Sequence, residues 1–422
     1  MISHIDADAF FASAIVRKNP HLGGKPLLAL GMGGGCVIAA SYEAKAFGVK
    51  TGMRLKDALV LCPKAVHVPA DFHEAARASH EIEAILQRLC PLVQQMSIDE
   101  WYLDLHTVTG GLPHDLEAWA RLHQNEIHRK VGLTVSVGIG PSKILAKMAG
   151  EYRKPAGVTV VTLPLSPSLS SEALAKEEGG RGPGGGGLSL ETFLRDRPAG
   201  AIPGVGRQRM IHTEARGWKT AWDFAQAPTE ELKKLFGKPG VELQQELLGT
   251  IVSEVTSDEA PPKSVSRCRS FRPTKRREIL WAHLLRHAEY LMLKMRRHAL
   301  MCRGISVWMR DGEYKGYGSN ASLPQPTQTL DAILPFVRQC FEKGYDPRIT
   351  YTQIALAFWQ LVPSGATQYS LFESAVMNDR DEAIQKSLDA LHERFGRSSI
   401  TRGSAMGVKT GTAVTMDLSV YG

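Results

Sequence analysis

The sequence predicts a protein of several domains that combines an α/β domain with an α+β domain. Three observations support this. The 422 residues exceed what one hydrophobic core ordinarily accommodates. Strand-like and helix-like patterns alternate through residues 1–165, as in an α/β sheet domain. After segments rich in glycine and serine, residues 263–362 follow the order β-α-β-β-α-β, a split βαβ fold.

Composition and the start of the chain argue against export and membrane insertion. Hydrophobic residues make up 43% and charged residues 22% of the chain, which is typical of a soluble globular protein. Residues Met1 to Asp6 lack the basic lead of a signal peptide. The longest weakly polar run, Leu27 to Ala40, is shorter than the about 20 residues that span a bilayer. We therefore expect a cytoplasmic protein without a membrane partner.

The cysteines indicate a reducing environment. They are far apart, and none forms the close pairs that zinc sites or redox motifs require. We interpret them as reduced side chains that serve packing. They are Cys36, Cys62, Cys90, Cys268, Cys302 and Cys340.

The pattern of apolar and polar residues in 1–165 predicts strands and helices in alternation. Gly31 to Gly35 resembles a dinucleotide-binding loop, but a strand-like segment follows it, so no helix N-terminus is available to hold a pyrophosphate. We interpret these glycines as a hairpin loop. The expected helices are 10–16, 42–47, 55–61, 73–89, 112–131 and 142–152, and the expected strands are 2–6, 36–40, 97–105, 134–139 and 158–161.

The chain changes character after Leu165. Residues 166–190 predict a flexible connection, because seven of the nine residues 179–187 are glycine and cannot recover their ordering entropy by burial. Residues 191–252 have helical spacing and include the segment Ile202-Pro203-Gly204-Val205-Gly206. It resembles a helix-hairpin-helix turn, whose backbone N–H groups can hold a DNA phosphate, although any tight glycine turn between helices would look the same. A second linker, 253–262, follows.

The net positive charge of the chain is concentrated in the next segment. From Lys263 to Lys315 there are fourteen Lys and Arg and four acids, a net charge of +10, whereas the whole chain has +8. Such a segment fits a polyanion, most simply the phosphates of nucleic acid. A solvated basic surface, the alternative, would more often be interleaved with acids. The expected elements are a strand at 264–271, a helix at 279–300, strands at 305–309 and 314–322, a helix at 330–341 and a strand at 354–361, which leave one sheet face free.

Two adjacent acids, Asp99 and Glu100, interrupt the strand-like segment SIDEWYLDL, residues 97–105. Neighbouring side chains on a strand point to opposite faces, so at least one acid must be paired, solvated in a cleft or bound to a metal. A strand end or turn is the simpler interpretation. However, Asp6 ends the first expected strand, in the region where open α/β sheets place ligands. If the two strands are neighbours, three carboxylates converge and cannot all stay charged without a cation.

A site whose ligands are oxygen atoms, with no cysteine sulfur among them, favours Mg²⁺. This ion completes its coordination shell with phosphates of the substrate. Two such ions about 3.5–4 Å apart can activate a 3′-hydroxyl and stabilise a leaving pyrophosphate. The acids therefore predict two Mg²⁺ ions and phosphoryl transfer to a growing strand. Asp8 is either a further acid on the same strand face as Asp6 or a structural hydrogen-bond acceptor, and our interpretation favours the acceptor.

Several segments, in this order and spacing, resemble the Y-family of translesion DNA polymerases: DADAFFAS, ASYEAKAFGVKTGM, SIDEWYLDL, TVSVGIGPSKILAKMAGEYRKPAG and IPGVG. The resemblance covers roughly residues 1–362 and implies a right-hand polymerase. The implied parts are an α/β palm with small fingers in 1–165 (fingers roughly 12–72), a helical thumb in 191–252 and a DNA-gripping little finger in 263–362. Residues 179–187 exceed the usual palm-to-thumb connection of the family, and we expect them to be disordered and catalytically neutral.

The resemblance also implies roles for residues of the palm. Asp6 and Asp99 match the shared metal ligands of the family. Glu100 matches the catalytic acid that holds the ion at the primer end. The carbonyl of Ala7 would complete the ion on the nucleotide side.

Further matches concern the incoming nucleotide. Phe11 matches the steric gate, an aromatic ring that leaves no room for a 2′-hydroxyl, and Phe10 matches a position whose backbone lies along the triphosphate. Simple core packing is the alternative for both rings. Tyr42 and Lys154 match positions that bind the triphosphate. Lys45 stands where many members have Arg, so the charge survives but the bidentate fork is lost, which lowers the expected affinity.

DNA is expected to contact the hairpin turn and the basic segment through its phosphates. Binding should weaken steeply as salt rises. The expected DNA-binding residues are Gly204, Gly206, Arg267, Arg269, Arg272, Lys275, Arg276 and Arg277.

Residues 363–422 form a tail. Gln368-Tyr369-Ser370-Leu371-Phe372 resembles the clamp-binding peptide of bacterial polymerases, in which Leu371 and Phe372 would anchor an apolar pocket and Gln368 would fix orientation; the expected clamp-binding residues are Gln368, Ser370, Leu371 and Phe372. Farther on, Ile384, Leu388, Leu391 and Phe395 share one face of an expected helix. The tail resembles the end of the SOS mutagenesis polymerase subunit.

The leading hypothesis is an error-tolerant, template-directed DNA polymerase that acts past lesions in DNA damage tolerance. Its expected partners are primer-template DNA, deoxynucleoside triphosphates (dNTPs) and a sliding clamp, and the chain is expected to be a monomer. A non-catalytic clamp-tethered adaptor of the same fold is the alternative, against which the presence of Asp6, Asp99 and Glu100 argues. A metal-dependent glycosyltransferase that uses Asp6-x-Asp8 would leave the basic segment unexplained.

Overall fold

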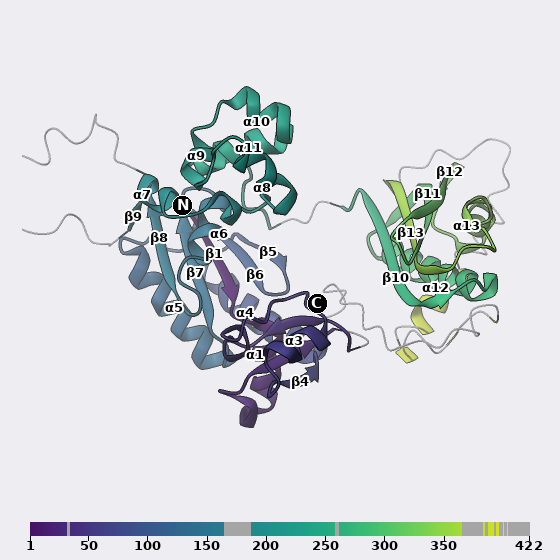
Figure 1. Cartoon of the computed structure of the whole chain (residues 1–422), viewed down its shortest axis with the longest axis horizontal. Coiled ribbons are helices and arrows are strands. Elements are labelled where there is room, and N and C mark those ends of the chain that lie inside the picture. The colour runs from purple at the N-terminus through teal and green to yellow at the C-terminus, as the bar shows by residue number, and fades with distance from the viewer. Residues whose placement is uncertain are drawn as a thin grey trace, which may run out of the picture. The chain divides into compact units, whose positions relative to one another are not determined.

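A computed structural model describes residues 1–31, 34–163, 187–257 and 261–364, and residues 383–384, 387–391, 394–395, 400 and 403 of the tail. These residues fall into two compact units, one that ends at residue 257 and one that begins at residue 261 (Figure 1). Most of the expected connection 166–190 and the whole segment 368–372 lie outside the described residues. None of the described helices combines the length and the apolar character needed to cross a bilayer.

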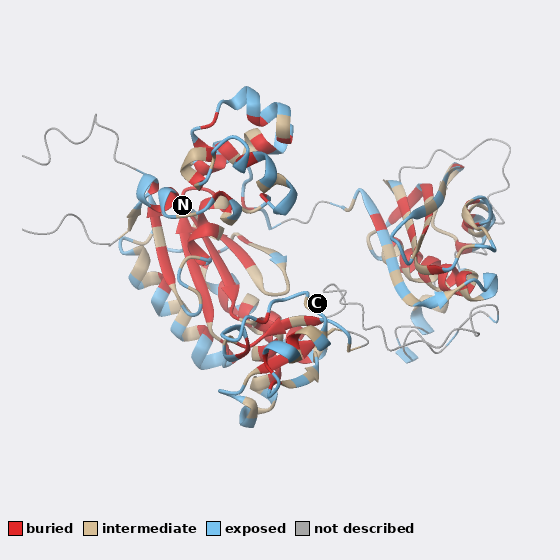
Figure 2. Cartoon of the chain, in the orientation of Figure 1, coloured by how far each residue is buried: buried red, intermediate tan, exposed pale blue. Residues whose placement is uncertain are grey.

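The first unit is built on a mixed six-stranded sheet in the order β5-β6-β1-β7-β8-β9. The strand β1 pairs antiparallel with both β6 and β7, whereas β7, β8 and β9 are parallel. All six residues of β1 are buried, and buried residues follow the strands of this sheet (Figure 2). The strands are β1 (Ile2–Ala7), β5 (Val93–Ser97), β6 (Glu100–Asp104), β7 (Val135–Gly140), β8 (Val158–Thr162) and β9 (Leu188–Ser189).

Helices cover both faces of this sheet. The helices α4 (Phe72–Leu89) and α5 (Leu116–Val131) pack on the face that carries Ile5 and Trp101. The helix α6 (Lys143–Gly150) packs on the other face, where Ile2, Tyr102 and Ala146 form a small cluster. Side chains alternate along β1, so Asp6 lies on the α6 face. A short helix, η2 (Leu105–Thr107), follows β6.

A second, three-stranded sheet has the order β3-β2-β4. The pair β2 and β3 is antiparallel, which confirms the hairpin interpretation of the glycine-rich segment between them. The sequence did not predict β4, which pairs parallel with β2. The elements are α1 (Phe10–Lys18), η1 (Pro20–Leu22), β2 (Leu27–Leu30), β3 (Val37–Ala40), α2 (Tyr42–Lys45), α3 (Leu55–Leu61) and β4 (Val66–Pro69).

A helical part follows β9 and packs around Phe193, Phe224 and Leu232. The expected hairpin turn precedes α8, and Gly204 in it has a φ of 93°, a conformation that L-residues with a side chain rarely adopt. The Val205 N–H donates to the Ile202 carbonyl at 2.9 Å and closes the turn. The elements are α7 (Leu190–Arg195), η5 (Ala199–Ala201), α8 (Arg207–Glu214), α9 (Ala221–Ala225), α10 (Thr229–Phe236) and α11 (Lys238–Leu247).

The second unit confirms the β-α-β-β-α-β order. Its antiparallel sheet has the order β10-β13-β11-β12, and residues of both helices share one core with one face of the sheet. The elements are β10 (Ser264–Thr274), α12 (Arg277–Arg297), β11 (Leu300–Asp311), β12 (Gly316–Thr327), α13 (Leu330–Gly344) and β13 (Tyr351–Pro363).

All six cysteines are free thiols. Four are buried, as the packing interpretation predicts, but Cys36 and Cys268 are exposed. The packing role is therefore wrong for these two. Cys268 is exposed because it alternates along β10 with Arg267 and Arg269, which face the helices.

Candidate active site

The two adjacent acids lie at a hairpin turn. The strand β5 ends at Ser97, residues Ile98 and Asp99 form the turn, and β6 begins at Glu100. The expectation of one continuous strand over residues 97–105 is therefore wrong, and the simpler interpretation of a strand end or turn is confirmed. The acids do not break a strand alternation, because Asp99 belongs to the turn and Glu100 is the first residue of β6.

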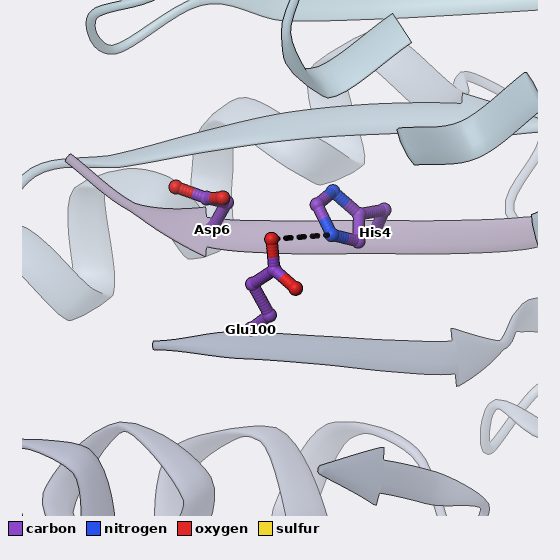
Figure 3. A group of neighbouring side chains, drawn as sticks. All are labelled: His4, Asp6 and Glu100. Atoms are coloured by element: carbon purple, nitrogen blue, oxygen red, sulfur yellow. Dashed lines mark ion pairs between the residues drawn. The ribbon is translucent and has the colours of Figure 1, made fainter. Parts of the chain in front are cut away.

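Asp6 is the register partner of Glu100. Because β1 and β6 are antiparallel, the end of β1 meets the beginning of β6, and the Ala7 N–H donates to the Asp99 carbonyl at 2.9 Å. Ligand atoms of His4, Asp6 and Glu100 lie within 4.8 Å of one another. Glu100 extends from β6 toward the two side chains of β1 (Figure 3). The expected convergence of the strands that carry Asp6 and Glu100 is thus present.

The Asp99 side chain has a different environment. Its carboxylate accepts a hydrogen bond from the Ser97 hydroxyl at 2.5 Å, and burial raises its pKa. Among the described residues, the group close enough to share a cation contains His4, Asp6 and Glu100 and not Asp99. The metal-ligand roles of Asp99 and of the Ala7 carbonyl stay predictions.

His4 was not singled out from the sequence, where it is one more residue of a buried strand. Its side chain is fully buried, and neither ring nitrogen has a hydrogen-bond partner among the described residues. Burial and, to a smaller extent, the positive charge of Lys147 together lower the pKa of His4 to about 3. His4 is therefore neutral at pH 7, and its 4.0 Å approach to Glu100 is not an ion pair there.

Each carboxylate of the pair accepts a hydrogen bond from a lysine. The Lys147 ammonium lies 2.5 Å from Glu100 Oε1, and the Lys154 ammonium lies 2.6 Å from Asp6 Oδ1. The helix that carries Lys147 approaches the sheet closely because Gly138 has no side chain; a Cβ there would lie 2.1 Å from the Ala146 carbonyl oxygen. Sequence reasoning predicted Lys154 as a site residue but missed Lys147, whose pairing depends on how α6 packs.

The two carboxyl groups have opposite pKa shifts. Burial raises the pKa of Asp6 to about 7, although Lys154 acts in the other direction. Burial alone would also raise the pKa of Glu100, but the hydrogen bond and charge of Lys147 lower it below the ordinary value. The two carboxylates lie side by side, Asp6 is 7% exposed, and their oxygen atoms are ligands of the kind that a hard divalent cation takes.

Asp8 is 2% exposed and serves as a hydrogen-bond acceptor. Its Oδ1 accepts from the Ser136 hydroxyl at 2.8 Å and from the Tyr42 hydroxyl at 3.3 Å, and its Oδ2 accepts from the Ala156 N–H at 2.8 Å. The structural interpretation of Asp8 is therefore confirmed. Through these hydrogen bonds, its carboxylate connects α2 and the segment after α6 to β7.

The residues expected to bind a triphosphate gather beside Asp6 and Asp8. Tyr42 contacts Asp8, and the Lys45 ammonium lies 4.3 Å from the centroid of the Tyr42 ring. Burial lowers the pKa of Lys45, and the nearby Lys154 adds to this effect. The structure thus brings Tyr42, Lys45 and Lys154 close to Asp6 and Asp8.

The two phenylalanines at the start of α1 differ in burial. Phe10 is 2% exposed and packs in the main core, as the core-packing alternative predicts for its side chain. Phe11 is half-buried, and its ring lies edge-on to Phe10 and Phe72, with centroid distances of 5.6 Å to each. The partly exposed ring of Phe11 is the one that a bound molecule could touch.

Two of the expected DNA-binding arginines of β10, Arg267 and Arg269, lie on the helix-covered face of the sheet. Arg267 and Arg269 pair with the buried residues Leu356 and Ile354, and Arg267 lies 4.1 Å from the ring centroid of Tyr290 in α12. The period of two along Val265, Arg267, Arg269 and Phe271 could have indicated this. The other expected basic residues, Arg272, Lys275, Arg276 and Arg277, are exposed.

The opposite face of this sheet carries small polar residues, two tryptophans and an arginine that the sequence did not single out. Ser266 and Ser270 are exposed on it. The Arg310 guanidinium lies 4.0 Å from the ring centroid of Trp308, and Trp359 donates to Ser306 at 2.9 Å.

Comparison with known proteins shows the following similarities. Residues 5–151 match the impB/mucB/samB family, and residues 262–371 match its C-terminal domain. The chain is 30% identical over 415 residues to DNA polymerase IV of Caulobacter vibrioides, which covers 96% of this chain and 94% of that protein. It is 32% identical over 376 residues to DNA polymerase IV of Xanthomonas axonopodis pv. citri, which covers 88% of this chain and 97% of that protein.

Two solved structures have a similar fold. One is a Y-family DNA polymerase chimera, with a TM-score of 0.68 and 22% identity. The other is an insertion ternary complex of Dbh DNA polymerase, with a TM-score of 0.56 and 23% identity. Each similarity covers 86% of this chain and 99% of the other chain.

Proposed function

This chain belongs to the impB/mucB/samB family of Y-family DNA polymerases, and we propose that it is a template-directed, error-tolerant DNA polymerase that extends primers past damaged bases. The observation that carries the proposal is the pairing of Asp6 with Glu100 at the meeting point of β1 and β6, beside Tyr42, Lys45 and Lys154. Acids and triphosphate-binding groups in one place are what nucleotidyl transfer requires.

Each side chain has a proposed role. Asp6 and Glu100, with Asp99 and the Ala7 carbonyl nearby, would hold two divalent cations, which we propose to be Mg²⁺. When bound, these cations would activate the primer 3′-hydroxyl and neutralise the leaving pyrophosphate. Lys154, Lys45 and the Tyr42 hydroxyl would orient the triphosphate through charge-assisted hydrogen bonds.

The remaining expected residues would select and hold the substrates. Phe11 would exclude a 2′-hydroxyl, and the backbone N–H groups at Gly204 and Gly206 would hold a DNA phosphate. The exposed basic residues from Arg272 to Arg277 would contact further phosphates, and Arg310 is an additional candidate on the opposite sheet face.

Primer extension tests this function directly. The full chain, a primer-template, the four dNTPs and Mg²⁺ should yield extended primers, and Glu100→Gln and Asp6→Asn should reduce extension at least about 100-fold, because the cation ligands are lost. Glu117→Gln, which changes a partly exposed acid of α5 that pairs with Arg121, is the matched control and should extend normally. If the wild-type chain binds primer-template but incorporates no nucleotide, the adaptor alternative holds and the polymerase proposal fails.

We also propose that the chain binds a sliding clamp through residues 368–372, which lie outside the described residues. Replacing Leu371 and Phe372 together by Ala should spare synthesis without clamp and abolish its stimulation by clamp. Ser374→Ala is the neighbouring control. Stimulation that survives the double replacement would refute the peptide assignment.

A further inference from the structure

Two lysine ammonium groups neutralise the acid pair. Lys154 donates to Asp6 at 2.6 Å and Lys147 donates to Glu100 at 2.5 Å. The two lysines reach the pair from the same side of the sheet, one from α6 and the other from the segment that follows it. Each of the two carboxylates therefore accepts a hydrogen bond from one lysine ammonium group.

The two lysines are not equivalent. Lys154 divides its charge between Asp6 and Glu151, which lies 2.7 Å away. Among the described residues, the acid paired with Lys147 is Glu100, and the two side chains are only 27% and 21% exposed. This ion pair is therefore shielded from water more than an ordinary surface pair, which makes it stronger and its geometry better defined.

The packing of α6 fixes where Lys147 reaches. Six of its eight residues are buried, and Gly138 lets the helix backbone lie against β7. On the far side, the His4 ring lies 4.0 Å from Glu100 and makes no hydrogen bond to it, whereas the Lys147 ammonium does. The ammonium is held in place by the fold and is not a flexible surface charge that happens to approach an acid.

An ammonium on Glu100 excludes a second cation from the same oxygen. At such short separation, two positive charges in a half-buried site repel each other strongly, so a divalent ion can use Glu100 Oε1 only after the ammonium leaves. Lysine and divalent cation are thus alternative occupants of one position.

We propose that Lys147 is a positioning residue that stands in for a divalent cation at Glu100 and competes with that cation for the carboxylate. It keeps the Glu100 side chain in place at the start of β6 in the free protein. It also makes cation loading harder until substrate phosphates offer the ammonium another partner. The inference relies on the proposed function only for the expectation that Glu100 binds a divalent ion.

Mn²⁺ binding to the DNA-free full chain tests this, with electron paramagnetic resonance reporting the loss of free Mn²⁺. Lys147→Met should tighten Glu100-dependent Mn²⁺ binding about two- to tenfold, because the competing cation is removed. Lys147→Arg retains the charge and should keep the wild-type affinity. Binding that remains in Glu100→Gln is subtracted as independent of the site. Lys130→Met is the matched control, since the exposed Lys130 pairs with Glu126 within α5, and it should change nothing.

Equal or weaker Mn²⁺ binding in Lys147→Met would overturn the proposal, as would the absence of Glu100-dependent binding in every variant. Lys147→Gln, which can still donate a hydrogen bond to Glu100, provides a second uncharged variant if the methionine destabilises the fold. Because the measurement uses neither DNA nor nucleotide, a chain without polymerase activity could still show the competition. Failure of the proposed function and failure of this inference are therefore distinguishable.

Discussion

Asp6 and Glu100 are direct register partners across an antiparallel strand pair, and each accepts a hydrogen bond from a different lysine. The antiparallel pairing is the reason that two acids from distant parts of the sequence meet at one edge of the sheet. They lie on the face covered by α6, whereas Ile5 and Trp101 fill the opposite face. The two acids therefore lie on one face of these strands, and the apolar residues of the core lie on the other face.

Asp8 supports this site through hydrogen bonds, so we predict that Asp8→Asn lowers the free energy of unfolding by about 1–3 kcal/mol. Ser136, Tyr42 and Ala156 all donate hydrogen bonds to Asp8. In asparagine an NH₂ group, which is itself a donor, would replace one of the two accepting oxygens. Urea unfolding measures the loss. Ser136→Ala removes one donor and leaves the carboxylate with the others, so it should cost less than Asp8→Asn. Equal stability of Asp8→Asn and wild type would contradict the structural role.

Local patterns in the sequence predicted the elements whose apolar periodicity is strong. The helix at 55–61 has the predicted bounds, and the order β-α-β-β-α-β was predicted as well. The strand β4 was missed because it has only four residues and two of them are exposed. A turn at Asp99 and Glu100 was the simpler interpretation of the adjacent acids, but its exact place at Ile98 and Asp99 was not predicted, because the apolar Ile98 continues the strand-like pattern.

The partners of the acids were harder to predict than the acids themselves. The identity of Asp6 and Glu100 is visible in the sequence, but the pairing of Glu100 with Lys147 depends on the close packing of α6 at Gly138. Burial of His4 likewise depends on the whole sheet. Spacing along the chain contains no direct information on such contacts.

Phe11 is expected to control sugar selection, and Phe11→Ala should raise ribonucleotide incorporation about ten- to hundredfold. A steric clash between the 2′-hydroxyl and the Phe11 ring costs about 1–3 kcal/mol. Removal of the ring removes this cost and gives the expected rise of about ten- to hundredfold. The ratio of kcat/KM for a ribonucleotide and its deoxynucleotide is the measurement. Phe11→Tyr retains the ring and should retain most of the selectivity. Unchanged sugar selectivity in the alanine variant would refute the assignment.

Lys45 should make nucleotide binding sensitive to alkaline pH. Burial and the neighbouring Lys154 lower its pKa, so its positive charge is lost at a lower pH than that of an ordinary lysine. As pH rises through this lowered pKa, the attraction for the triphosphate falls and KM for dNTP rises. Lys45→Arg stays charged and can bind bidentately, so we expect a KM about two- to tenfold lower and a flatter pH profile.

The measurement for Lys45 is KM for one dNTP between pH 7 and pH 9.5 at fixed Mg²⁺. Lys50→Arg, an exposed lysine a few residues away, is the control and should follow the wild-type profile. If the wild-type and Lys45→Arg profiles have the same slope, then Lys45 does not bind the triphosphate in its charged form.

Glu246 attaches the segment after α11 to the first unit. It is 4% exposed, and its carboxylate accepts from the backbone N–H groups of Val252, Ser253 and Ile144 at 2.9 to 3.2 Å. Lys143 reinforces this attachment by donating to the Glu254 carbonyl at 2.7 Å. A single buried carboxylate therefore connects α11, α6 and the segment leading out of the unit.

We predict that Glu246→Ala lowers the free energy of unfolding by about 3 kcal/mol, because three backbone donors lose their acceptor in a buried place. Hydrogen exchange should also become faster at Val252 and Ser253, whose N–H groups are protected by Glu246. Glu242→Ala, one helical turn earlier and paired with the exposed Lys238, should change stability by less than about 0.5 kcal/mol. Because both variants shorten a glutamate on the same helix, a difference between them isolates the buried acceptor, and equal exchange rates at residues 252 and 253 would contradict its role.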